Sequence, residues 1–226
     1  MHRGQKSSTL EFGLFETRNG KLETILVRYL CKFLTSAGDA RQFPPPTVPE
    51  VAFLGRSNVG KSSVINSLLG EKVAKTSSTP GRTRTINFFL LRRQGAPKPE
   101  VIFADLPGYG YAKLSREVTA EWPSFIDPYL QERLALALCI CLVDVSIPPQ
   151  ERDKQLVEFL RFAERNFLIV CTKSDRLSHN QLNTALQKFK QEFGTDRLLP
   201  FSAKTAAGRN ELWEEIRKAA EEFVIQ

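Results

Sequence analysis

The chain contains few of the residues from which metal centres and disulfide frameworks are built. It has two histidines among 226 residues, His2 and His179, and neither stands in a pattern that indicates catalysis or metal binding. Its four cysteines show no zinc-ligand spacing, and Cys139 and Cys141 would share one face of a strand as small core residues. Unpaired cysteines are typical of a reducing compartment, so we expect a cytoplasmic protein.

Long apolar runs are also missing. The longest, Leu134 to Val143, is much shorter than the roughly 20 residues that cross a membrane as a helix, so no membrane partner is expected. Residues 1–18 carry acidic side chains and no apolar core, unlike a signal peptide, and we expect them to form a tail. No internal repeat is visible, and 226 residues suffice for one large α/β domain.

Positive charge exceeds negative charge, with 32 Lys and Arg residues against 25 Asp and Glu and a net charge of +7. Such an excess favours a polyanionic partner. Basic residues with tyrosines between them suit RNA, because phosphates attract the charges and splayed bases stack on aromatic rings. The residues concerned are Arg82, Arg84, Arg92, Arg93, Tyr109, Tyr111, Lys113 and Arg116. The alternative is a solvated basic face, with the tyrosines packed against the domain.

The strongest signal is a glycine-rich motif, G-x-x-x-x-G-K-S, at Gly55 to Ser62. The apolar stretch 51–54 before it is typical of a buried strand, and residues 63–69 after it have the pattern of a helix. In this setting, backbone N–H groups and the positive end of the helix surround phosphate oxygens. Lys61 is expected to reach the β- and γ-phosphates, and the Ser62 hydroxyl to ligate Mg²⁺.

A second motif, Asp105-Leu106-Pro107-Gly108, follows an apolar stretch at 101–104 that is typical of a buried strand. Asp105 at the carboxyl end of this strand is suited to accept a hydrogen bond from a water that is itself bound to Mg²⁺, a hard cation that keeps several waters. Gly108 has no side chain, so its N–H group can approach the γ-phosphate closely. An ordinary Asp-x-Pro-Gly turn is the alternative, and the phosphate loop upstream weighs against it.

Two further motifs, Thr172-Lys173-Ser174-Asp175 and Ser202-Ala203-Lys204, would hold a guanine base. Asp175 can accept hydrogen bonds from both the ring N–H and the amino group of guanine, whereas adenine offers no such pair. The stem of Lys173 can lie over the base, and the Ala203 N–H can meet the guanine O6. By itself the second motif is more typical of an ordinary loop; its position after the last strand weighs against that interpretation.

Strand-like and helix-like segments alternate, which favours a mostly parallel sheet with helices on both faces. We predict six strands, near 50–55, 85–92, 100–105, 136–144, 167–172 and 198–201. The predicted helices are near 61–69, 116–133, 151–164, 178–193 and 208–224. The polar turn 93–99 is too short for a crossover helix, so the second and third strands should be antiparallel.

The sequence resembles the bacterial ribosome-biogenesis GTP-binding proteins of the EngB (YihA/YsxC) family, within the translation-factor class of GTPases. The resemblance rests on residues 55–63, 79–89 and 105–112, with similarity also over 122–133, and it covers roughly residues 33–226. It implies an α/β fold of the P-loop GTPase (Ras-like) type, GTP and GDP as ligands with Mg²⁺, and hydrolysis of GTP to GDP and phosphate. It also implies a monomer that assists assembly of the large ribosomal subunit, with that subunit or its precursors as partner.

On this basis residues 46–226 form the GTPase domain and residues 1–45 an N-terminal extension. Apolar residues between Leu22 and Leu34 follow helical spacing. A helix or strand that packs on the domain is one interpretation, and a partner-binding or membrane-surface helix is the other. Residues 42–46 end in three prolines and predict a stiff linker.

The resemblance also assigns roles to individual residues. Thr83 is expected to lie in switch I and to be the second hydroxyl ligand of Mg²⁺ beside Ser62, while residues 81–85 close over the nucleotide. The residues expected to act in hydrolysis are Asn58, Lys61, Thr83 and Gly108. The residues expected to contact the nucleotide are Gly55, Arg56, Ser57, Asn58, Val59, Gly60, Lys61, Ser62, Gly81, Arg82, Thr83, Arg84, Thr85, Asp105, Leu106, Pro107, Gly108, Thr172, Lys173, Ser174, Asp175, Phe201, Ser202 and Ala203.

Three positions bear on the rate of GTP hydrolysis and on the affinity for the nucleotide. Thr172 stands where many GTPases have Asn, and its shorter side chain should brace the loop less well. Tyr109 stands where Ras-type enzymes have a Gln that orients the attacking water, so intrinsic hydrolysis should be slow. Asn58 occupies the position at which similar potassium-dependent GTPases hold K⁺, so we expect K⁺ as a further cofactor that stimulates turnover. A loop-bracing role for Asn58 is the alternative.

Two functions remain open from the sequence. The first is a slow GTPase that assists assembly of the large ribosomal subunit and uses hydrolysis for release. The second is a nucleotide-switched interaction module at a membrane or cell-division site, in which hydrolysis is incidental. The missing apolar span and the positive charge favour the first.

Overall fold

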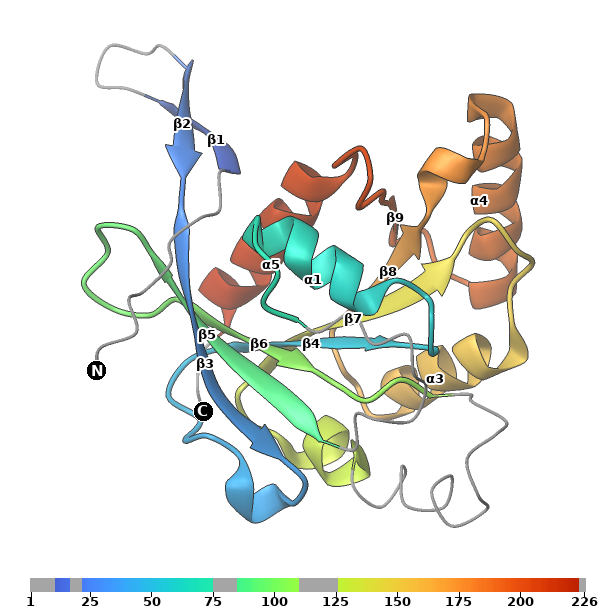
Figure 1. Ribbon diagram of the computed structural model, residues 1–226. Coiled ribbons are helices and arrows are strands. Elements are labelled where there is room, and N and C mark those ends of the chain that lie inside the picture. The colour runs from blue at the N-terminus through green and yellow to red at the C-terminus, as the bar shows by residue number, and fades with distance from the viewer. Residues whose placement is uncertain (1–10, 17–21, 75–84, 110–125, 224–226) are drawn as a thin grey trace.

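The computed structural model describes residues 11–16, 22–74, 85–109 and 126–223 (Figure 1). Its main feature is a seven-stranded sheet with the strand order β3-β5-β6-β4-β7-β8-β9. The strands are β3 (Tyr29–Ala37), β4 (Glu50–Gly55), β5 (Ile86–Arg93), β6 (Val101–Asp105), β7 (Leu136–Asp144), β8 (Phe167–Thr172) and β9 (Leu198–Pro200). A two-stranded antiparallel sheet pairs β1 (Glu11–Glu16) with β2 (Leu22–Val27).

Helices cover both faces of the large sheet (Figure 1). The helices are α1 (Lys61–Leu69), α3 (Glu151–Phe162), α4 (His179–Phe193) and α5 (Arg209–Glu222), with short 3-10 helices η1 (Ala40–Gln42) and η2 (Ser174–Arg176). One core lies under α1 and α5; the other lies under α3, α4 and the helical residues 126–132. Because side chains alternate along a strand, Val51 and Phe53 of β4 enter the first core and Ala52 and Leu54 the second.

The strand directions agree with the prediction. β4 is parallel to β6 and β7, and β7, β8 and β9 continue in the same direction. Among the strands of this sheet, β5 is the one that runs the other way, since it is antiparallel to both β3 and β6. The antiparallel pair inferred from the short turn 93–99 is therefore confirmed, and each of the six predicted strands is present.

Four of the predicted helices are found within two residues of their expected ends. The fifth, predicted over 116–133, is helical over 126–132, and its earlier part lies outside the described residues.

The sheet has seven strands rather than six, because β3 pairs with β5 in the segment assigned to an extension. The helical spacing there was misleading. A bulge between Phe33 and Thr35 shifts the register, so Tyr29 and Cys31 face the first core whereas Ala37 faces the second. Apolar residues that change face do not alternate along the sequence, and the sheet begins upstream of the boundary expected at residue 46. Within the tail expected over residues 1–18, Glu11–Glu16 form β1.

The proline-containing segment 42–46 is fixed to the domain through a buried carboxylate. Glu50, which is fully buried, accepts hydrogen bonds from the Tyr129 hydroxyl at 2.9 Å and from Arg133 Nε at 3.0 Å. Arg133 Nη2 also donates to the Pro44 carbonyl at 2.5 Å, and its guanidinium lies over the Phe43 ring. The network therefore joins the start of β4 to the segment before it and to residues 126–132.

Arg133→Ala should destabilise the fold strongly, because Glu50 would keep its buried charge and lose its countercharge. We expect a loss of about 3 kcal/mol in the free energy of unfolding, measured by urea denaturation. Lys190→Ala, which breaks an exposed ion pair with Asp196, is the control and should leave the transition midpoint unchanged. Equal midpoints for the two variants would contradict this role of Glu50.

Candidate guanine-nucleotide site

The four sequence motifs meet at one edge of the sheet. The glycine-rich loop follows β4, Asp105 ends β6, Thr172 ends β8, and Ser202 follows β9. These strands are parallel, so their carboxyl ends share an edge, which is where open α/β sheets bind ligands.

The glycine-rich loop has the backbone conformation of an anion-binding turn. Asn58 and Gly60 both adopt left-handed conformations, with φ of 66° and 105°. At Gly55 a Cβ would lie 2.7 Å from Val59 Cγ1, so that position requires glycine. The loop runs directly into α1, and the first amides of a helix have no acceptor inside it. The loop and α1 together offer N–H groups to phosphate oxygens.

Lys61 and Asp105 form an ion pair at the base of this loop. The Asp105 carboxylate is buried at the end of β6, and Lys61 stands at the start of α1 next to Ser62. Among the described residues no group of three His, Cys, Asp or Glu side chains is arranged to hold a metal ion. Mg²⁺ does not need such a group, because it takes one or two protein oxygens and completes its shell with phosphate oxygens and water. Ser62 and Asp105 fit such a site.

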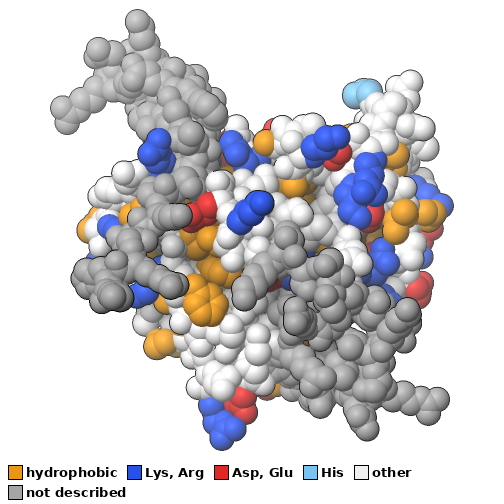
Figure 2. All heavy atoms as spheres, viewed as in Figure 1, with side chains coloured by type: hydrophobic (Ala, Val, Ile, Leu, Met, Phe, Trp, Pro, Cys, Tyr) orange, Lys and Arg blue, Asp and Glu red, His pale blue; other side chains and the backbone are white. Residues whose placement is uncertain are grey.

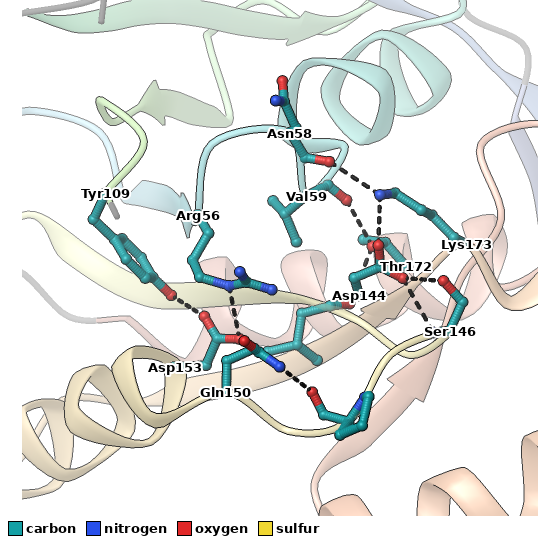
Figure 3. A network of polar contacts seen from close by, with 12 residues as sticks. Arg56, Asn58, Val59, Tyr109, Asp144, Ser146, Gln150, Asp153, Thr172 and Lys173 are labelled. Atoms are coloured by element: carbon teal, nitrogen blue, oxygen red, sulfur yellow. Dashed lines mark hydrogen bonds and ion pairs between the residues drawn. The ribbon is translucent and has the colours of Figure 1, made fainter. Parts of the chain in front are cut away.

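The end of the second motif packs directly on the glycine-rich loop. A Cβ at Gly108 would lie 3.1 Å from Ser57 Oγ and 3.2 Å from Ser57 N, and the Ser57 N–H donates to the Tyr109 carbonyl at 3.0 Å. The Tyr109 hydroxyl donates to Asp153 Oδ1 at 2.8 Å (Figure 3). Burial raises the pKa of this phenol, and the neighbouring Asp153 carboxylate raises it further.

The RNA hypothesis expected Tyr109 to be an exposed ring between basic residues. These contacts show that it is not. Its ring packs against the second core, and its hydroxyl is held by α3. The basic residues expected beside it are also separated. Asn87 pairs with Asp105 at the site edge, so Arg92 and Arg93 lie at the opposite end of β5, where Arg93 forms an ion pair with Glu100. The remaining members of that group, Arg82, Arg84, Tyr111, Lys113 and Arg116, lie outside the described residues.

Thr172 braces the loop despite its short side chain. Its hydroxyl lies 2.7 Å from the Val59 carbonyl and 3.0 Å from the Val143 carbonyl. A hydroxyl has one hydrogen, so it donates to one of these carbonyls at a time. The contact joins β8 to the glycine-rich loop, and the weaker bracing expected relative to asparagine stays a prediction.

Lys173 joins the base motif to the loop, and Asp144 directs it. Its ammonium donates to the Asn58 carbonyl at 3.0 Å and to Asp144 Oδ2 at 2.5 Å (Figure 3). Asp144 also accepts from the Ser146 N–H at 3.0 Å. Burial opposes ionisation of Asp144, but the hydrogen bonds from Lys173 and Ser146 outweigh it and lower the pKa of the carboxyl.

Sequence reasoning missed Asp144. The available signal was its position at the carboxyl end of the long buried strand β7, which lies beside β4 in the sheet.

The last two motifs are joined through a side-chain hydrogen bond. Ser202 Oγ donates to Asp175 Oδ1 at 2.7 Å, and the Ser202 hydroxyl also accepts from the backbone N–H groups of Lys204 and Thr205. Phe201 and Ser202 are buried, whereas Asp175 and Ala203 are exposed at the edge. The Ser202 loop is therefore organised around Asp175, which favours the base-binding role over an ordinary loop.

The predicted switch I residues are only partly described. Gly81, Arg82, Thr83 and Arg84 lie outside the described residues, and Thr85 is half-buried at the start of β5. The second Mg²⁺ ligand expected at Thr83 therefore stays a prediction.

Comparison with known proteins identifies the family. The family model described as "50S ribosome-binding GTPase" matches residues 50–173. The protein named "Probable GTP-binding protein EngB" from Koribacter versatilis is 60% identical over 194 residues, which cover 86% of this chain and 96% of that protein. A relative with the same name from Acidobacterium capsulatum is 58% identical over 192 residues, covering 84% of this chain and 91% of that protein. The chain belongs to the EngB family of GTP-binding proteins. It is a GTPase with a P-loop nucleotide site, as the motifs predicted.

Solved structures show the same fold. A crystal structure of a probable GTP-binding protein engB aligns with a TM-score of 0.62 at 23% identity and covers 76% of this chain and 99% of that one. Era of Aquifex aeolicus bound to GDP and AlF4⁻ aligns with a TM-score of 0.65 at 24% identity, covering 76% of this chain and 56% of Era. Among the described residues, no helix is long and apolar enough to span a bilayer.

Asp175→Asn should change which base the site accepts. The amide would present a donor where guanine also presents its amino group, whereas xanthine has a carbonyl there. We expect GDP affinity to fall on the order of 100-fold and XDP affinity to rise, measured by calorimetry on both variants. Unchanged GDP affinity in the variant would contradict the assignment of Asp175 as the carboxylate that binds guanine.

Proposed function

We propose that this EngB-family GTPase is a slow enzyme that acts as a switch in assembly of the large ribosomal subunit. The observation that carries the proposal is the match of residues 50–173 to a family described as 50S ribosome-binding GTPases. The net charge of +7 supports a partner rich in RNA, since basic proteins are drawn to polyanions.

Slow hydrolysis follows from the side chain after the Asp-Leu-Pro-Gly motif. Tyr109 replaces the glutamine that orients water in Ras-type enzymes, and its hydroxyl is already engaged by Asp153 at 2.8 Å. The charge that develops on the phosphates would then be met by Lys61, by Mg²⁺ at Ser62 and Thr83, and by a further cation at Asn58.

The RNA-facing surface, in this proposal, uses residues near the switches rather than one broad basic face. Figure 2 shows Lys and Arg side chains spread around the drawn face, several of them beside Asp or Glu side chains. Lys154 with Glu192 and Arg197 with Glu215 are examples of such pairs. Paired charges attract phosphates less. We propose Arg82 and Arg84, which belong to the predicted switch I, as RNA contacts.

Hydrolysis should be faster in K⁺ than in Na⁺, and Asn58 should carry the difference. The Asn58 side chain is exposed, points away from Lys173 and makes no hydrogen bond within the described residues (Figure 3). A K⁺ ion near it would offset charge between the β- and γ-phosphates. We expect stimulation on the order of tenfold or more, below that of an arginine finger.

The measurement is steady-state GTP turnover in KCl and NaCl at equal ionic strength, for the parent and Asn58→Ala. The substitution should abolish the difference between the salts. Equal parent rates in the two salts would remove the K⁺ hypothesis, and a difference that survives Asn58→Ala would place the ion elsewhere.

Association with large ribosomal subunits should depend on the nucleotide and on salt. Switch I (75–85) and switch II (106–116) should order around a γ-phosphate through Thr83 and Gly108. Pelleting of purified protein with large subunits or their precursors should be stronger with a non-hydrolysable GTP analogue than with GDP. It should weaken steeply as salt is added, because phosphate contacts release counterions.

The variant with Ala at Arg82 and Arg84 should pellet less while its GDP affinity changes little. Equal pelleting with GTP analogue and GDP, or none at low salt, would count against the ribosomal role. Those outcomes would favour a nucleotide-switched interaction module at a membrane or cell-division site, the alternative that the sequence left open.

A further inference from the structure

Asp153 is a buried carboxylate with both of its described side-chain partners in the nucleotide site. It lies in the first turn of α3 and is 2% exposed. One oxygen accepts from the Tyr109 hydroxyl at 2.8 Å, and the other accepts from Arg56 Nε at 3.2 Å (Figure 3). A carboxylate in a first helical turn also interacts favourably with the helix dipole, but that role does not require burial. The buried position instead places the carboxylate in contact with Arg56 and Tyr109.

These two partners come from the two segments that hold phosphates. Arg56 is the second residue of the glycine-rich loop, and Tyr109 directly follows Gly108. The same two residues form a β-bridge with each other. Asp153 therefore holds the loop and the start of switch II against α3 at one point.

Tyr109 is fixed on two sides as a result. Its carbonyl accepts the Ser57 N–H at 3.0 Å on the loop side, and its hydroxyl is bound to Asp153 on the helix side. Gly108 lies against Ser57, where a Cβ would be 3.1 Å from Ser57 Oγ, a close contact. Gly108 is thus joined on its C-terminal side to a residue held at both ends, which restricts where the Gly108 amide can lie.

We propose that Asp153 is a positioning residue for GTP hydrolysis, which acts through Tyr109 to hold the Gly108 amide where it meets the γ-phosphate. It touches neither nucleotide nor metal. Its effect is on preorganisation: a donor fixed before the phosphate arrives stabilises developing charge without reorganising. The inference rests on the predicted contact of Gly108 with the γ-phosphate, and it does not depend on the proposed ribosomal role.

This arrangement predicts an effect that separates GTP from GDP. GDP has no γ-phosphate, so its binding relies on the loop amides and the base motif. The affinity for a non-hydrolysable GTP analogue and the kcat for GTP should both depend on the hydrogen bond between Tyr109 and Asp153, whereas GDP affinity should not.

Two conservative variants test the link from Asp153 through Tyr109 to the Gly108 amide. Tyr109→Phe removes the hydroxyl and keeps the ring in its packing, whereas Asp153→Asn leaves one acceptor oxygen for two donors, the Tyr109 hydroxyl and Arg56 Nε. Each should lower kcat and analogue affinity roughly three- to tenfold. In Tyr109→Phe, which leaves the Arg56 ion pair intact, GDP affinity should change by less than about twofold. Because both act through one hydrogen bond, the double variant should be no worse than the more impaired single variant.

Two further variants serve as controls. Lys154→Gln, on the same helix, breaks an exposed pair with Glu192 and should leave both affinities and kcat unchanged. Asp144→Asn disturbs Lys173 on the base side and should weaken GDP and the analogue by the same factor.

The measurements are fluorescence titration with GDP and the analogue, kcat at saturating GTP, and thermal unfolding of each variant. Equal loss of GDP and analogue affinity in Tyr109→Phe would overturn the proposal, as would unchanged kcat, a gain in preference for the analogue, or additive effects in the double variant. Should Asp153→Asn fail to fold, the Tyr109→Phe result decides alone.

Discussion

Three carboxylates around the glycine-rich loop each require a cation, and this requirement organises the site. Asp105 ends β6 and pairs with Lys61, Asp144 ends β7 and pairs with Lys173, and Asp153 lies in α3 and pairs with Arg56. All three carboxylates are buried, so removing the cation of a pair would leave an uncompensated buried charge. The cations come from the loop or from the base motif, and the pairs therefore tie the nucleotide-binding segments to the sheet and to α3.

The same pairs divide the site into a phosphate side and a base side. Lys61 and Arg56 belong to the glycine-rich motif. Of their partners, Asp105 begins the second motif and Asp153 contacts Tyr109 directly after it. Lys173 crosses to the loop from the base side, where it reaches the Asn58 carbonyl. A change on the base side should affect all guanine nucleotides alike, whereas a change at Tyr109 affects those with a γ-phosphate. This division follows from which segment each cation belongs to.

Much of the fold could be predicted because its local signals agree with its tertiary structure. The six strands from β4 to β9 were found from apolar runs, and the reversed strand β5 from a turn too short for a helix. Strand β3 was not among the predicted strands, and the segment was left open as a helix or a strand packed on the domain. The reason is that its bulge moves Tyr29 and Ala37 to opposite faces, which removes the alternation that marks a strand. The packing of Tyr109 stayed open for a different reason: an aromatic residue among basic residues has the same local pattern whether it is exposed or packed.

By itself the sequence determined the ligand class and the edge of the sheet that binds it. Four motifs in order, each following a strand, place phosphate and base contacts at the carboxyl ends of those strands, because parallel strands share that edge. The tertiary structure decided which charges meet. Lys61 and Asp105 are 44 positions apart, and Arg56 and Asp153 are 97 apart. No local pattern links residues at such separations; their pairing depends on the strand order and on where α3 packs, which become defined only when the two cores close on the sheet.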